Sequence, residues 1–469
     1  MKKIINKTIL ALGITAMMTS CSKKFLDEQP HTSLSPALAL TDAAAMQTAL
    51  NGAYAQLRVT SLYGRDFPIV GDLMADNIFL EVDNSGRYLN QFQYTVANSD
   101  GVPDNDWNYG YGVINAANQI IDAKITGTDV VKAQAYAIRA LTYFKLVNIY
   151  ARPYTDNPAG LGVPLILHYD PYLLPTRETI ANVYAQIISD FKAAMQNAPD
   201  YTSSITLSKY SIEALLARAY LYMGDNANAK TAALDVINNG GFTLVNTAAD
   251  YKAFWANGGE QKNKSEVLFE IDVTSTNNNG PDDLGSFYLG GYQDVYASKQ
   301  LVDLYSATDI RTAVLIADST KSKAPATLVA KYPNGASTSD RDNLKVIRLA
   351  EVYLIAAEAS LPGSETDAKT YLNDLMSYRD PSFAGYTSTG AQLLTDIVTE
   401  RRKELAFEGD RLYDLNRLKL DIDRGPQNAG SIPPQVQTIS YSDYRRISPI
   451  GTTEIQANAN IKPQQNPDY

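Results

Sequence analysis

Apolar residues at helical spacing fill the segment 41–59, near the start of the chain. Its apolar positions recur every three or four residues: Met46, Leu50, Tyr54 and Leu57. This period is typical of an amphipathic helix. Thr41 and Asp42 stand directly before it, and such side chains cap helix N-termini. The pattern therefore predicts one capped helix over 41–59.

Two longer segments of the same kind follow at 129–151 and 177–199. The first has residues on one face that let a neighbouring helix approach closely: Ala133, Ala137, Ala140 and Phe144. The second is expected to begin after Thr176 as its cap. It ends at Pro199, because proline cannot continue a helix.

Residues 212–242 have the spacing of a tetratricopeptide repeat, in which two antiparallel helices pack together. With Gly224 at the turn, the positions typical of the repeat hold small or apolar residues: Leu216, Ala217, Tyr220, Ala229, Ala233 and Val236. Residues 350–375 repeat the pattern with Gly363 at the turn. A continuous array would repeat every ~34 residues, so these two units must be separated by a large insertion.

The insertion, about 243–340, has a different pattern. Residues 265–275 favour a strand, and residues 276–296 form a loop rich in Gly, Asn and Asp. A second irregular region, 71–112, interrupts the helices earlier, and the chain becomes rich in Pro, Gln and Asn after residue 418. The sequence predicts a mostly α fold, in which helix pairs support long loops and a few short strands.

The first twenty residues have the three-part layout of a secretory signal peptide. Lysines come first, and the apolar run Ile9–Met18 is too short to span a membrane as a helix. Two small residues, Thr19 and Ser20, follow, and then comes the only cysteine of the chain, Cys21. This arrangement predicts a bacterial lipoprotein whose Cys21 is acylated and anchors the chain to a membrane. The alternative is an ordinary signal peptide followed by a chance cysteine.

The net charge of the 469-residue chain is −10 at pH 7. An acidic chain lacks the basic surface that offsets phosphate charge, so nucleic acid is not an expected partner. The sequence contains no H-E-x-x-H, G-x-S-x-G or Walker A motif. We therefore predict no enzyme activity, no metal and no cofactor.

Three glutamates, Glu400, Glu404 and Glu408, recur four residues apart, which would place them on one helical face. A pair of carboxylates is enough for a glycosidase. These glutamates stand among four basic residues: Arg401, Arg402, Lys403 and Arg411. An ion-pair network is therefore the favoured interpretation.

Several stretches, taken together, resemble one family, the SusD/RagB-like outer-membrane lipoproteins. They occur in the family's order along nearly the whole chain: 21–30 (CSKKFLDEQP), 137–151, 183–199, 214–244, 348–359, 400–419 (ERRKELAFEGDRLYDLNRLK) and 464–469 (QQNPDY). Two features depart from the family. Residues 447–451 read ISPIG where a hydrophobic Pro-Ile-Pro segment is usual, and no acidic cluster directly follows Cys21.

The resemblance implies a SusD-like fold, in which four tetratricopeptide-type helix pairs support an irregular, loop-rich face. It also implies a partner, a SusC-like TonB-dependent transporter, over which such proteins capture nutrient oligomers for import. The expected organisation has these parts: a signal peptide (1–20), a tether (21–40) and one domain (41–469) made of a helical scaffold (41–242 and 341–418), a loop-rich insertion (243–340) and an irregular C-terminal segment (419–469).

Ligand residues have to be chosen from local chemistry, because binding positions vary within the family. Sugar rings favour flat aromatic faces flanked by hydrogen-bonding groups. Two loops offer this mixture: Asp76, Asn77, Arg87 and Tyr88 in the first, and Asp283, Phe287, Tyr288, Tyr292 and Tyr296 in the second. The aromatic residues of the second loop could equally pack the loop itself. Trp107, placed just before a helix, is expected to pack rather than to bind.

The leading hypothesis is a lipid-anchored protein of the cell outer membrane, facing outside, that captures glycans without catalysis. The closest alternative is capture of oligopeptides by the same architecture, since peptides bind through backbone hydrogen bonds and shallow pockets. A third hypothesis is a structural scaffold whose loops only seal the transporter.

Overall fold

The computed structural model describes residues 39–318, 326–335, 341–425, 427 and 432–469. The predicted signal peptide and the predicted lipidation site, Cys21, lie outside these residues. Among the described helices, none is both long and apolar enough to cross a membrane.

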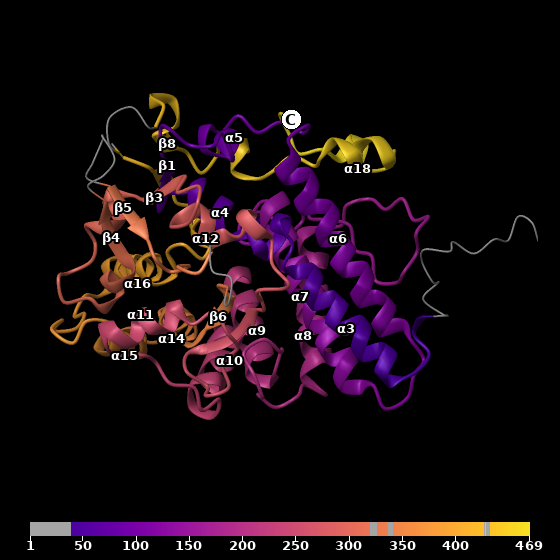
Figure 1. Ribbon diagram of the computed structural model, residues 1–469, viewed down its shortest axis with the longest axis horizontal. Coiled ribbons are helices and arrows are strands. Elements are labelled where there is room, and N and C mark those ends of the chain that lie inside the picture. Colours follow the sequence, from indigo (N-terminus) through magenta and orange to yellow (C-terminus); the bar gives the residue numbers. More distant parts are fainter. Residues whose placement is uncertain (1–38, 319–325, 336–340, 426, 428–431) are drawn as a thin grey trace, which may run out of the picture.

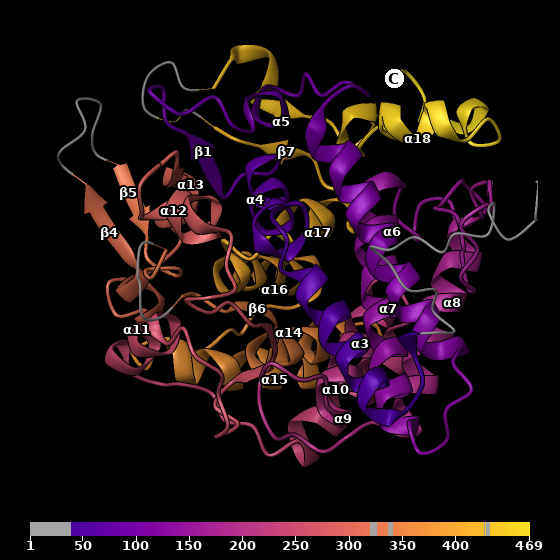
Figure 2. The ribbon, with the colours of Figure 1, turned by 45° about the vertical axis from the view of Figure 1, so that its right-hand side comes forward.

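Four helices from the first half of the chain, α3, α6, α7 and α8, form a layer on one side of the molecule (Figure 2). Helix α7 is buried along most of its length, because α3, α6 and α8 pack around it. The elements of this half have these bounds: α3 (Ala43–Leu57), η2 (Thr60–Gly64), α4 (Asp66–Leu73), β1 (Ile78–Leu80), α5 (Leu89–Gln93), α6 (Gly101–Asp122), α7 (Asp129–Tyr150) and α8 (Ile180–Met195).

The helix starts show which capping predictions hold. Asp42 caps α3 as predicted, since its carboxylate accepts a hydrogen bond from the backbone N–H of Ala45 at 2.8 Å. Helix α8 begins three residues later than predicted. Its cap is Thr179, whose hydroxyl accepts from the N–H of Asn182, and not Thr176. Thr176 lies in the preceding irregular segment.

The region 71–112 is more regular than predicted. It contains β1, α5 and the first turns of α6, which starts at Gly101 after Asp100 as its cap. Pro103 is tolerated there because the first turn of a helix needs no intrahelical N–H donor. Trp107 therefore lies inside α6 and not before it. It is 2% exposed, and its ring lies 4.9 Å from that of Tyr150, which confirms the packing role.

Both tetratricopeptide-like units form helix pairs as predicted: α9 (Lys209–Met223) with α10 (Asn226–Asn239), and α14 (Leu349–Ser360) with α15 (Glu365–Arg379). Gly224 ends α9 in the left-handed region, at a φ of 76°, where glycine carries no Cβ penalty. Helix α14 packs against α10 (Figure 1). The two units are thus neighbours in space, although the insertion separates them in sequence.

The insertion and the C-terminal part add short elements around this scaffold. The predicted strand is β2, which pairs antiparallel with β6. Strands of the described residues form two-stranded sheets only, in the pairs β1–β3, β2–β6, β4–β5 and β7–β8. The fold is mostly α, as predicted. The remaining bounds are α11 (Ala248–Ala256), β2 (Val267–Ile271), η3 (Gly280–Asp282), α12 (Leu284–Tyr288), β3 (Val295–Ala297), α13 (Lys299–Val302), η4 (Ile310–Val314), β4 (Leu315–Asp318), β5 (Ala326–Val329), β6 (Leu344–Arg348), α16 (Gly390–Leu405), α17 (Arg411–Arg417), β7 (Ile422–Asp423), η5 (Pro434–Val436), β8 (Thr438–Ile439), η6 (Tyr444–Arg446), α18 (Thr452–Ala457) and η7 (Lys462–Gln464).

The last described residues fold back onto the first helices. Arg177, just before α8, donates hydrogen bonds to the backbone oxygen of Gln464 and to the side-chain oxygen of Asn466, both at 2.8 Å. Asn466 in turn donates to the backbone oxygen of Tyr150, at the end of α7. The irregular C-terminal segment is therefore an integral part of the helical layer.

Candidate functional site

The predicted ion-pair network around the three glutamates is present. Glu404 sits at its centre, and its carboxylate is within 3.2 Å of three guanidinium groups. We call this set the glutamate network; it consists of Glu266, Glu400, Glu404 and Glu408 with Arg311, Arg348 and Arg379. Its carboxylates bind arginines, which is a structural use of these residues.

The arginines of the glutamate network come from other segments of the chain. Of the four basic residues that flank the glutamates in sequence, Lys403 binds Glu400 at 2.7 Å, whereas Arg401 binds Glu351 and Asp414. Helix α16 ends at Leu405, so Glu408 leaves the helical face on which it was predicted. Burial raises the pKa of Glu404, but the charges of the three arginines outweigh it and hold that pKa well below its usual range.

The two loops chosen as binding loops meet around Arg65, which lies between η2 and α4. The guanidinium of Arg65 donates to the hydroxyl of Tyr88 at 2.6 Å and to the carboxylate of Asp282 at 2.8 Å. It also lies 5.1 Å from the ring centroid of Phe287. Tyr88 is held further by a hydrogen bond from its hydroxyl to Asp66. Arg65 thus ties the first loop to the second.

On the outer side of this contact, Arg87 of the first loop stacks on Tyr292 of the second. The guanidinium carbon lies 4.1 Å from the ring centroid, and one guanidinium nitrogen donates to the tyrosine hydroxyl at 2.9 Å. The side chains of Arg87 and of neighbouring Asp282 are 36% and 40% exposed. We call the whole set the loop cluster; it consists of Arg65, Arg87, Tyr88, Asp282, Phe287 and Tyr292.

A hollow of about 390 Å³ opens beside Tyr292. We call it the loop hollow; it is lined by Gly280, Pro281, Ser286, Gly291, Tyr292, Gly335 and Arg341. A Cβ atom at Gly280 or Gly291 would meet no atom within 4 Å, so these glycines border open space. The hollow offers one aromatic side chain together with charged and hydroxyl groups.

Most of the other predicted ligand residues are covered by protein atoms. Asp76 is ion-paired with Arg411 at 2.8 Å, and Asn77 donates to Asp72 at 2.7 Å. Asp283 is buried and accepts from the N–H of Asn279. In this conformation none of these three side chains is open to a ligand.

Each buried aromatic residue of the two loops packs against another aromatic ring of the protein. Tyr296 lies on β3, which pairs with β1, and its ring stacks on Phe79 at 6.0 Å. Tyr288 stacks on Tyr332 at 5.8 Å, and Phe287 packs against Tyr88 at 5.4 Å. The packing alternative therefore describes these rings, and only Arg87 and Tyr292 of the nine predicted residues remain partly exposed.

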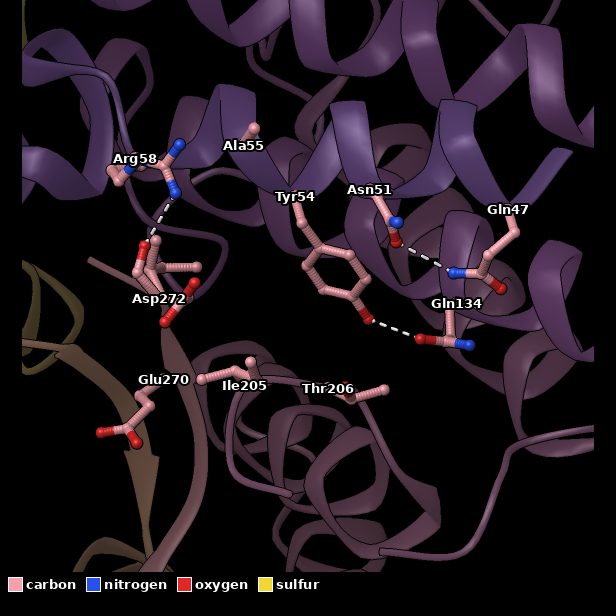
Figure 3. Close-up of a pocket in the computed structure, with 11 residues that line it drawn as sticks. Gln47, Asn51, Tyr54, Ala55, Arg58, Gln134, Ile205, Thr206, Glu270 and Asp272 are labelled. Carbon is pink, nitrogen blue, oxygen red and sulfur yellow. Dashed lines mark hydrogen bonds between the residues drawn. The ribbon is translucent and has the colours of Figure 1, made fainter. Parts of the chain in front are cut away.

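A second pocket, of about 430 Å³, lies between α3, the segment that precedes α9, and the end of β2 (Figure 3). We call it the α3 pocket; it is lined by Gln47, Asn51, Tyr54, Ala55, Arg58, Gln134, Ile205, Thr206, Glu270, Ile271 and Asp272. Our sequence reasoning missed it. The available signal was the second face of α3, where polar residues recur beside the apolar stripe.

Comparison with known proteins places the chain in a family. The pattern of a family described as "Starch-binding associating with outer membrane" matches residues 24–221, and that of the SusD family matches residues 326–469. A SusD-like protein, P2, from Formosa agariphila is 30% identical over 98% of this chain and 99% of its own. The chain belongs to the SusD family.

Solved structures agree with this assignment. A SusD superfamily protein from Bacteroides thetaiotaomicron is 31% identical and superposes with a TM-score of 0.83 over 91% of this chain and 100% of its own. A protein from Bacteroides vulgatus assigned as sugar-binding is 29% identical, with a TM-score of 0.81 over 92% of this chain and 99% of its own. This SusD-family chain shares their fold over nearly its whole described length.

Proposed function

We propose that this protein is a non-catalytic glycan-binding lipoprotein of the outer membrane, anchored through Cys21. It holds nutrient oligosaccharides at the loop hollow and delivers them to a SusC-like TonB-dependent transporter for import. The family description names starch binding and the outer membrane, and a relative with 29% identity is assigned as sugar-binding. Both support a glycan as the ligand.

The observation that carries the proposal is the partly exposed Arg87–Tyr292 pair, whose tyrosine lines the loop hollow. An aromatic ring covers the apolar C–H face of a sugar, while the guanidinium and the carboxylate of Asp282 satisfy its hydroxyl groups. The remaining aromatic rings of the loop cluster are buried behind this pair, so they hold it in place.

Calorimetry with a panel of polysaccharides and peptide digests tests the proposal. At least one glycan should bind, and Tyr292→Ala should weaken its binding at least tenfold. Tyr172→Ala is the matched control, because Tyr172 is 90% exposed and lines neither the loop hollow nor the α3 pocket. If only peptides give a binding heat, the ligand is an oligopeptide and not a glycan. If no ligand gives a binding heat, a purely structural scaffold is favoured.

The anchor and the transporter need separate tests. Metabolic labelling with a radioactive fatty acid should mark the wild-type chain, and Cys21→Ser should abolish the label. Affinity purification of the tagged chain from outer membranes should bring down a TonB-dependent transporter. An unlabelled chain that is released into the periplasm would contradict delivery at the outer membrane.

A further inference from the structure

The α3 pocket is preorganised around one tyrosine. The hydroxyl of Tyr54 donates to the side-chain oxygen of Gln134 at 2.8 Å and accepts from the backbone N–H of Leu207 at 3.0 Å. Both bonds fix the ring, which points into the pocket (Figure 3). The hydroxyl is occupied by the protein, so Tyr54 offers its ring face to a ligand without an ordering cost for the side chain.

The other lining groups keep unused hydrogen-bonding capacity. Within the part of the chain that the structure describes, the amide nitrogen of Asn51 and the hydroxyl of Thr206 donate no hydrogen bond, and the carboxylate of Asp272 accepts none. Arg58 donates through one guanidinium nitrogen, to the backbone oxygen of Asp272 at 2.9 Å, and its other guanidinium nitrogens make no hydrogen bond to the described residues. The pocket thus presents donors and acceptors together.

The charges of the lining are balanced, which favours a ligand with no net charge. Arg58 carries one positive charge and Asp272 one negative charge, while the carboxylate of Glu270 is 3.6 Å from the ammonium group of Lys345. An anion attracted by Arg58 would be repelled by Asp272, and the reverse holds for a cation, so neither gains a net attraction from this pair. A neutral ligand with many hydroxyl groups satisfies both sides, because each hydroxyl can donate and accept.

The size of the pocket limits the length of that ligand. A volume of about 430 Å³ lies at the lower end of the range of roughly 300–1,000 Å³ typical of small-molecule sites. The pocket is therefore large enough for a short sugar unit and too small to enclose a polysaccharide.

One segment connects the α3 pocket with the loop hollow. Asp272 lines the first, whereas Gly280 and Pro281 line the second. Between them, Asn279 donates to the backbone oxygen of Arg58 at 2.9 Å, which fixes the segment to the end of α3. The two ends of one short stretch of chain, 272–281, thus line the two different hollows.

We propose that the α3 pocket is a second saccharide site, which binds a neutral mono- or disaccharide unit on the face of Tyr54. The proposal rests on the glycan-binding function inferred above and adds a site that the loop hollow does not include. Asn51, Arg58 and Asp272 hydrogen-bond the sugar hydroxyls, and the tyrosine ring packs on its C–H face.

Calorimetry of the full-length protein in detergent, titrated with maltose, laminaribiose and cellobiose, tests the second site. At least one disaccharide should bind. Ala55→Trp, which fills the pocket from the half-buried face of α3, should weaken that binding at least tenfold. Thr48→Trp is the control, because Thr48 lies on the exposed face of the same helix and does not line the pocket.

Asn51→Ala provides a second, milder variant, since alanine is a good helix former at an exposed position. It should weaken binding several-fold without a loss of helical content. Tyr172→Ala should leave disaccharide binding unchanged, because Tyr172 lines neither the α3 pocket nor the loop hollow. Any of three results would overturn the second site. They are no binding heat with any of the three sugars, equally tight disaccharide binding by Ala55→Trp and the wild type, and binding heats with dipeptides only. If polysaccharide binding is lost in Tyr292→Ala but unchanged in Ala55→Trp, the proposed function at the loop hollow stands and the second site at the α3 pocket does not.

Discussion

The glutamate network and the loop cluster are built from the same residue types, arginine and carboxylate with aromatic rings beside them. In the glutamate network, Arg348 is fully buried and binds three carboxylates at 2.6–2.9 Å. In the loop cluster, Arg87 is 36% exposed and stacks on one tyrosine. Both join segments that are far apart in the sequence.

The comparison teaches that unused hydrogen-bonding capacity, and not residue type, separates the structural glutamate network from the loop cluster that we propose as a binding site. A buried charge must be fully paired, because leaving it unpaired costs several kcal/mol. An exposed charge has water as an alternative partner, so it can exchange that water for a ligand. The variants below test this difference, from the largest expected effect to the smallest.

Glu404→Gln should have the largest effect on stability. It leaves Arg311, Arg348 and Arg379 facing a neutral amide, and removing one partner of a buried ion pair costs about 3–5 kcal/mol. Urea denaturation followed by circular dichroism measures the loss. Asp303→Asn is the control, because Asp303 pairs with Lys299 on the surface. A loss below about 1 kcal/mol for Glu404→Gln would show that the network is not a unit of stability.

Arg87→Ala should separate binding from stability. We expect at least tenfold weaker glycan binding, which corresponds to about 1.4 kcal/mol. The free energy of unfolding should change by less than about 1 kcal/mol, since an exposed cation–π contact contributes about 0.5–1 kcal/mol. Arg445→Ala is the matched control, because Arg445 is also partly exposed and lies near the ring of Tyr444. Unfolding of the Arg87 variant without a binding defect would assign Arg87 to the structure.

The pH dependence of stability should run in opposite directions in the two regions. Burial raises the pKa of Asp342, beside the loop hollow, from 3.8 to about 7. A carboxyl with a raised folded-state pKa stabilises fully below its unfolded pKa, and this contribution is lost as the pH rises through 7. Glu404 has a lowered pKa, so its contribution is present above the unfolded pKa of 4.5 and is lost on acidification.

Asp342→Asn isolates the first of these effects, since an amide does not titrate. Its free energy of unfolding, compared with that of the wild type, should rise between pH 4 and pH 8. Asn334 donates two hydrogen bonds to Asp342, so the variant carries a constant loss that does not alter this slope. Urea denaturation at pH 5 and pH 8 measures it, and a difference that is independent of pH would contradict the assignment.

Lys299→Ala should have the smallest effect. Lys299 and Asp303 form an exposed pair four residues apart, and such pairs contribute about 0.3–0.5 kcal/mol. Added salt should remove even this difference, because it screens exposed charges. If Lys299→Ala lowered the free energy of unfolding by more than about 1 kcal/mol, exposed pairs would also be strong in this protein, and the contrast with Glu404 would fail.

The helices could be predicted because their apolar faces are local. The spacing within 41–59 and around Gly224 records the same faces that the folded chain buries, so α3, α9 and α10 were found near their observed bounds. The start of α8 was misplaced because Thr176 and Thr179 are both chemically able to cap. Only the path of the preceding segment decides between them.

The candidate site could be predicted only in part. A tyrosine in a loop rich in glycine suggests an exposed ring, but Tyr296 becomes buried when β3 pairs with β1, whose residues lie more than 200 positions earlier. No local pattern announces such a partner. The same limit applies to Glu404, whose arginines come from separate segments, and to the α3 pocket, which exists only after β2 has packed beside α3.

The return of the C-terminal segment also orders events in time. The partners of Arg177, Gln464 and Asn466, lie 287 and 289 residues further along the chain, so they are synthesised long after α7 and α8. Until then the guanidinium of Arg177 lacks the two acceptors that the C-terminal segment supplies. Helices α7 and α8 can pack before the C-terminal segment is made, but the contact that joins them to that segment can form only at the end of synthesis.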